Sequence, residues 1–300
     1  MGFSWRPDTS GLFVPAPEFT DTSRYERTTM IDVKKVAEQI ELLLRKHSIK
    51  LGESSDLLRM LVLAKQVQRK YIGCSFTMLE WFRLLQFRRI SSAVILLESD
   101  RNPSRYLRAI TRGSLNLFSK QRSLAKDTLW ELELWAMLKR KLASTYLLDP
   151  PDVMIEYADA RLGVSCKKIY SEAHVQNIMS EAVGQIKSSC EVGVVALNLD
   201  SLIPEDTVLK APTFESAREI LNEAMGKFLE KHERHIKKYF VRENLLAILV
   251  TMSPVADITN SRGRFNVVTQ SRIWTMPQCK ARHELHYRRF RDHIETVGSA

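Results

Sequence analysis

Apolar residues return at helical spacing through the first third of the chain. Between residues 30 and 46 they recur every three or four positions, which predicts an amphipathic helix, at Val33, Val36, Ile40, Leu43 and Leu44. A second helix is expected over about residues 54–71 and a third from about residue 77 toward 97. The pair Asn102-Pro103 interrupts this pattern, because the residue before a proline is pushed out of the helical region.

The pattern changes beyond this interruption, where short apolar runs alternate with longer helical stretches. The predicted elements are a helix over 119–142, strands over 145–149, 152–157 and 162–169, a helix over 171–187, a strand over 193–199, a helix over 213–239, and strands over 245–252 and 265–270. Helices mixed with strands in this order are typical of an α/β fold with a central sheet.

These patterns predict three parts of the chain. Residues 1–28 contain four residues that disfavour regular structure, Pro7, Gly11, Pro15 and Pro17, and predict an irregular arm. Residues 29–112 predict a helical domain that serves regulation, dimerisation or substrate recognition. Residues 113–300 predict an α/β domain with a central mixed sheet flanked by helices.

Composition narrows the class of partner and the compartment. The chain has 45 Lys and Arg against 35 Asp and Glu, a formal charge of +10, which favours polyanionic partners such as nucleic acid. Its four cysteines are widely spaced and form no CxxC pair, so neither a disulfide framework nor a closed zinc site is expected. No apolar run is long enough to cross a bilayer, and we expect a cytoplasmic protein without a membrane segment.

One constellation has the spacing of a catalytic site. Asp152 follows Pro151 at the start of a predicted strand, and after a tight turn near residues 158–163 the next strand contains Ser165-Cys166-Lys167. Because strand side chains alternate between faces, Ser165 and Lys167 point the same way, and hairpin pairing can bring Asp152 beside them. A carboxylate next to an ammonium group is what metal-dependent phosphodiester hydrolysis needs.

The same residues resemble the core of the PD-(D/E)XK, or restriction-endonuclease-like, nuclease superfamily. The resemblance rests on Trp130-Glu131, Pro151-Asp152 and Val164-Ser-Cys-Lys167, and covers about residues 119–200. It implies that Glu131 and Asp152 hold Mg²⁺ or Mn²⁺ and that Lys167 assists the attacking water. Glu133 is the second choice for the acid on the helix.

Ser165 departs from the family pattern, which has an acid at this position. A neutral hydroxyl is a poor ligand for a hard divalent cation. Some nucleases of the family read S-x-K and take their acid from the following helix, which implies Glu181 as the third metal ligand here, with Glu172 as a weaker candidate. Gln185, on the same helical stripe, resembles a glutamine that organises the site or contacts substrate.

We therefore expect a metal-dependent nuclease that hydrolyses DNA or RNA, with DNA favoured. The alternative is a catalytically degenerate chain of the same fold that acts as a nucleic-acid-binding or protein-interaction module. A third class, a helical adaptor without a nucleic-acid role, leaves the clustered motif unexplained. In the plainest alternative, Asp152 begins a strand while Lys167 and Glu131 lie on solvated faces. A homodimer or a protein partner through the helical region stays open.

The C-terminal segment is rich in arginine. It predicts a basic helix with aromatic anchors that contacts a phosphate backbone, or else an ordinary solvated helix, from Arg282, Tyr287, Arg288, Arg289, Phe290 and Arg291. A zinc interpretation of Cys279, His283, His286 and His293 matches no standard spacing.

Overall fold

The chain forms two compact units, each assembled from separate segments of the sequence. The computed structural model describes residues 13–15, 28–73, 77–140, 144–157, 159–242, 245–261, 265–277, 279 and 283–295. Unit 1 comprises Met1–Leu129, Ser201–Glu219 and Ser253–Val268, and unit 2 comprises Trp130–Asp200, Ile220–Met252 and Thr269–Ala300. The predicted domains over residues 29–112 and 113–300 remain a prediction, because a compact unit need not be a domain that folds alone.

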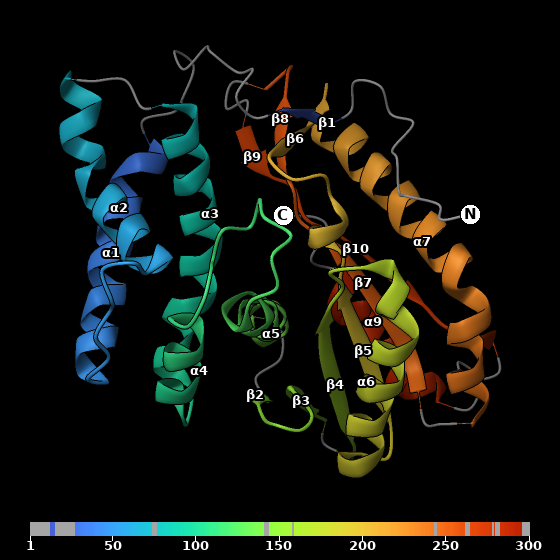
Figure 1. Cartoon of the computed structure of the whole chain (residues 1–300). Helices are drawn as coiled ribbons and strands as arrows, with labels where there is room; N and C mark the ends of the chain where they lie inside the picture. The colour runs from blue at the N-terminus through green and yellow to red at the C-terminus, as the bar shows by residue number, and fades with distance from the viewer. Residues whose placement is uncertain are drawn as a thin grey trace. The chain divides into compact units, whose positions relative to one another are not determined.

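The helices of unit 1 confirm the helical N-terminal part. Helices α1 (Thr28–Lys46), α2 (Asp56–Gly73) and α3 (Met78–Val94) lie side by side, and a 3-10 turn (Ile95–Ser99) leads to the short helix α4 (Pro103–Ile110) (Figure 1). Thr77 begins α3 as a capping box, since its hydroxyl accepts from the Glu80 amide while the Glu80 carboxylate accepts from the Thr77 amide. Pro103 occupies the first turn of α4, where a missing N–H costs nothing.

Unit 1 also contains a sheet that the sequence did not predict. Its order is β1 (Phe13–Pro15), β6 (Thr207–Ala211), β8 (Val255–Ile258) and β9 (Phe265–Val267). The arm predicted as irregular therefore contains a strand, paired antiparallel with β6, while its residues 1–12 and 16–27 lie outside the described ones. Phe82 of α3 packs edge-on against Phe265 of β9, with ring centroids 5.4 Å apart, which joins helices and sheet in one core.

Unit 2 is built on the predicted mixed sheet. Its strand order is β10 (Gln270–Trp274), β7 (Leu245–Met252), β5 (Gly193–Asn198), β4 (Arg161–Lys168), β3 (Val153–Glu156) and β2 (Thr145–Leu147). Strands β4, β5 and β7 are parallel, and the outer pairings are antiparallel. The single strand expected over 265–270 is instead two strands in different sheets, β9 and β10.

Helices flank this sheet, as expected for an α/β fold. They are α5 (Leu124–Lys139), α6 (Val175–Ser189), which packs on β4 and β5, α7 (Phe214–Arg242) and α9 (Glu284–Glu295) (Figure 1). Trp130 of α5 donates its indole N–H to the Ala196 carbonyl of β5 at 3.1 Å. Gly193 permits close packing of α6, since a Cβ there would lie 2.3 Å from an Ile186 methyl carbon. Among the described residues, none forms a helix both long and apolar enough to traverse a lipid bilayer.

Candidate active site at strands β3 and β4

Asp152 lies immediately before β3 with its carboxylate turned into the protein. Only 7% of the residue is exposed, and its Oδ2 accepts a hydrogen bond from the backbone N–H of Cys166 at 2.5 Å. Burial raises the pKa of Asp152 above its usual value, while the Cys166 amide and the nearby Lys167 ammonium oppose that rise. A cation beside this carboxylate would remove the cost that burial imposes on its charge.

Ser165 connects Asp152 to helix α6. The Ser165 hydroxyl is fully buried on β4 and donates to Oε1 of Gln185 at 2.7 Å, with Oδ2 of Asp152 at 3.5 Å. A hydroxyl has one proton, so the shorter contact takes it, and Asp152 depends chiefly on the Cys166 amide. The structure thus brings together three of the residues singled out in the sequence, from β3, β4 and α6.

Lys167 lies on the same face of β4 as Ser165 and also reaches α6. Its Nζ is 2.6 Å from Oε1 of Glu181, with the lysine side chain 15% exposed and the glutamate side chain 65% exposed. A charge-assisted bond of this length fixes the amine at the rim of the site. Glu181, the candidate third acid, is therefore engaged with Lys167.

The acid on α5 approaches β4 at Cys166. Burial raises the pKa of the Cys166 thiol, and the carboxylates of Asp152 and Glu131 raise it further. Glu131 is therefore near enough to act on Cys166, whose side chain points away from the face that Ser165 and Lys167 share. Buried in this way, Cys166 is a core residue.

Of the two second-choice acids, Glu172 is engaged by residues of α7. The Glu172 carboxylate accepts from Lys231 at 2.6 Å and lies 3.0 Å from Nε2 of His232, so it ties the turn after β4 to α7. Glu133 is a half-buried residue of α5. Within the described part of the chain, no three His, Cys, Asp or Glu side chains are gathered to hold a metal ion.

A second polar group, which the sequence analysis missed, lies next to this site. Lys168 donates to Oδ1 of Asn198, and its Nζ is 3.9 Å from Oδ2 of Asp200. The register places Lys168, Asn198 and Thr251 side by side near the carboxyl ends of the parallel strands. The available signal was the alternation of β4, which puts Lys168 on the face opposite Lys167 and makes it buried rather than solvent-facing.

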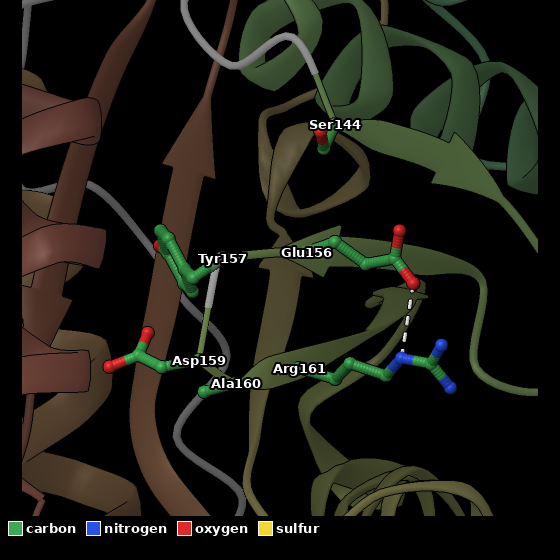
Figure 2. A pocket seen from close by; sticks show the side chains of 6 residues that line it. All are labelled: Ser144, Glu156, Tyr157, Asp159, Ala160 and Arg161. Atoms are coloured by element: carbon green, nitrogen blue, oxygen red, sulfur yellow. Dashed lines mark ion pairs between the residues drawn. The ribbon is translucent and has the colours of Figure 1, made fainter.

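A pocket of about 620 Å³ opens at the turn of the β3–β4 hairpin, lined by Ser144, Glu156, Tyr157, Asp159, Ala160 and Arg161 (Figure 2). Inside it, Arg161 Nε lies 3.0 Å from Oε1 of Glu156, which also accepts from the Tyr146 hydroxyl at 3.0 Å. Burial raises the pKa of Tyr157 to about 12, although the Arg289 guanidinium over its ring opposes the rise. The turn predicted near residues 158–163 is shorter than expected, because β3 ends at Glu156 and β4 already begins at Arg161; residue 158 lies outside the described residues.

The arginines of α9 are paired with carboxylates. Arg288 lies 2.6 Å from Glu284, Arg291 lies 2.9 Å from Asp292, and Arg289 pairs with Asp159 of the hairpin. Phe290 is buried, as the predicted aromatic anchor requires. Arg282 and the side chain of His293 lie outside the described residues. The described arginines of α9 thus hold the helix to the hairpin and to itself.

Comparisons of this chain with models of protein families, with curated proteins and with solved structures find no match. What the protein does must therefore be argued from its own residues.

Proposed function

We propose that this chain is a metal-dependent nuclease with a restriction-endonuclease-like core that hydrolyses phosphodiester bonds in DNA or RNA, with DNA the favoured candidate substrate. The observation that supports this most is the hydrogen-bonded group of Asp152, Ser165 and Gln185, with Lys167 two residues along the same strand face. A strand-borne carboxylate and ammonium on a rigid sheet are the groups that phosphodiester hydrolysis requires.

The donors fit Mg²⁺ or Mn²⁺ better than a metal that demands a closed protein cage. Mg²⁺ is commonly held by one or two carboxylates and keeps several water ligands, so a cluster of three acids is not required. Asp152 would be the principal ligand. Glu131, which acts on Cys166 from the other face of β4, and Glu181, which is paired with Lys167, would have to turn toward the cation to add a carboxylate. The cation would lower the pKa of a bound water and offset charge on the phosphate.

The protein's own groups have separate roles in this proposal. Asp152 keeps a buried carboxylate aimed by the Cys166 amide. Lys167 presents a positive charge that binds a phosphate oxygen or orients the attacking water, once Glu181 turns toward the cation. The Ser165–Gln185 hydrogen bond ties β4, whose Cys166 amide holds Asp152, to α6.

The second candidate function is nucleic-acid or protein binding without cleavage. The Lys167–Glu181 ion pair favours it, because this pair neutralises the proposed catalytic ammonium and occupies the third acid. The serine at position 165 favours it as well. The two functions differ in whether the chain cuts.

Cleavage of mixed DNA and RNA substrates with Mg²⁺ or Mn²⁺ tests the choice. The natural chain, Asp152→Ala and Lys167→Ala are compared, with the exposed Lys210→Ala as the matched lysine control. Cutting that needs metal, is lost in both site variants and survives in the control supports the nuclease. Nucleic acid that is bound but left intact by the natural chain supports the second candidate.

A further inference from the structure

Positive charge is concentrated in a stretch of unit 1 that runs through α4. Residues 101–126 contain no Asp or Glu and seven basic residues, Arg101, Arg105, Arg108, Arg112, Lys120, Arg122 and Lys126. The whole chain has a formal charge of +10, so this stretch supplies much of the excess. Such a concentration predicts a local positive potential rather than a uniformly basic surface.

The stretch is held firmly at the start of α4 and after its end. The buried side of α4 consists of Tyr106, Leu107 and Ile110. Ser104, in its first turn, lies 3.0 Å from Nδ1 of His47. Beyond α4, the Asp56 carboxylate accepts hydrogen bonds from the Ser114 hydroxyl and the Leu115 amide. The arginines are therefore mounted on a fixed backbone.

The next loop is anchored by a buried lysine. Lys126 is 1% exposed, and its Nζ donates to the carbonyl oxygens of Ser119 and Gln121 at 2.8 Å each. Its ammonium group is hydrogen-bonded to these carbonyls inside the unit, whereas the other six basic residues are exposed. The loop backbone is positioned by Lys126 without using the arginine side chains of α4 and its flanks.

The outward arginines of α4 and its flanks form one stripe. Arg101, Arg105, Arg108 and Arg112 are exposed and follow at intervals of four, three and four residues. Arg105 and Arg108 are neighbours on one face of α4, while Arg101 precedes the helix and Arg112 follows it. Among the described residues, Arg108 and Arg112 form no ion pair. This separates them from the carboxylate-paired arginines of α9.

Nearby acids adjoin the stretch at its two ends and at the turn after α4. Asp100 accepts from the Asn102 amide, and Glu205 accepts from the Lys120 amide. Asp127 lies 3.8 Å from Arg122. Asp56 adjoins the turn after α4, so the positive field is strongest along α4 itself.

We propose that the arginine stripe, defined as Arg101, Arg105, Arg108 and Arg112, binds the phosphate backbone of double-stranded DNA. Side chains three residues apart on a helix, as Arg105 and Arg108 are, lie about 5–6 Å apart, and Arg101 and Arg112 extend the positive charge beyond the two ends of α4. Duplex DNA presents dense negative charge, and a guanidinium binds phosphate oxygens in bidentate geometry. The contact positions the duplex without reading its sequence. Only the choice of DNA rests on the proposed nuclease function.

The test is duplex binding by the full chain at several salt concentrations, in the Asp152→Ala background and with EDTA so that no cleavage occurs. Fluorescence anisotropy with a mixed-sequence duplex compares Arg108→Gln/Arg112→Gln with Arg288→Gln/Arg291→Gln, which removes the same charge from α9. The stripe variant should bind on the order of tenfold more weakly, with the slope of log K against log salt less negative by about 1.8, or about 0.9 for each lost phosphate contact. The α9 variant should keep both values.

Equal losses in the two double variants would overturn the proposal, because net charge alone would then explain binding. It would also be overturned if the stripe variant kept full affinity, or if the chain bound anionic lipid vesicles or an acidic polypeptide and not the duplex. Duplex that is bound through the stripe but never cut with Mg²⁺ by the chain with Asp152 intact counts against the nuclease and leaves the stripe supported. Duplex that is cut equally well by the Arg108→Gln/Arg112→Gln variant supports the nuclease and counts against the stripe.

Discussion

Replacing Ser165 by aspartate tests the proposed metal centre at the position where the natural chain lacks an acidic ligand. Position 165 is where the resembled family has an acid, and here its hydroxyl is fully buried 3.5 Å from Oδ2 of Asp152. The Ser165→Asp variant places a second carboxylate against the first. Without a cation the two charges repel in a site that water does not reach. With a cation between them, the same pair becomes a better binding site than the natural chain offers.

The repulsion can be estimated from Coulomb's law. Two unit charges about 4 Å apart interact by about 4 kcal/mol at an effective dielectric constant of about 20, which is an upper value because the pair can take up a proton instead. Ser165→Asn is the matched control, since asparagine has the size of aspartate without its charge. The free energy of unfolding of Ser165→Asp in EDTA should therefore lie below that of Ser165→Asn by up to about 4 kcal/mol.

Mn²⁺ should narrow this gap. A ligand at about 100 times its Kd stabilises the folded state by about 2.7 kcal/mol, so saturating Mn²⁺ should recover most of the loss in Ser165→Asp and little in Ser165→Asn. Urea denaturation followed by tryptophan fluorescence measures the free energy of unfolding of each variant, in EDTA and with Mn²⁺. The reasoning is refuted if Mn²⁺ raises the stability of the two variants equally, because residue 165 would then not face a cation.

Three further predictions concern stability away from the proposed metal. Lys126→Ala should lower the free energy of unfolding by about 2–3 kcal/mol in urea denaturation, because two backbone carbonyls lose a charged donor. Burial lowers the pKa of His232 from 6.5, against the opposing effect of Glu172, so the unfolded chain binds the proton more tightly than the folded chain. Thermal stability should therefore fall as the pH drops from 6.5 through the lower pKa of the folded state, and thermal melts of His232→Gln should show a flatter dependence on pH. Gly113→Ala should cost about 1–3 kcal/mol, since φ is +98° and the added Cβ would lie 2.7 Å from a side-chain oxygen, whereas Gly52→Ala, which meets no atom within 4 Å, should cost less; equal losses in urea would contradict the conformational argument.

Strong periodicity explains which elements could be predicted. Helices α1, α2 and α3 carry apolar residues at helical spacing, and β5 and β7 are dense aliphatic runs buried along their whole length, so each element has a clear local signature. Strands β6 and β8 are short, at five and four residues, and pair with each other across a long stretch of sequence. Their pairing is decided by tertiary contacts, which a local pattern does not contain.

The candidate site divides in the same way. The alternation of β4 placed Ser165 and Lys167 on one face, and the helical stripe of α6 placed Gln185 toward it. The engagement of Glu181 by Lys167 was not predictable, because it depends on the distance between a helix and a strand rather than on spacing within either. Lys168, which the sequence analysis did not single out, is buried on the opposite face of the sheet, with its Nζ 3.9 Å from Oδ2 of Asp200.

Titration of the full chain with Mn²⁺, followed by electron paramagnetic resonance, tests the metal centre most directly. We expect bound Mn²⁺ in the natural chain, loss of binding in Asp152→Asn, and weaker binding in Glu181→Gln. Absence of bound Mn²⁺ in the natural chain, or binding unchanged in Asp152→Asn, would contradict a metal-dependent nuclease at this site.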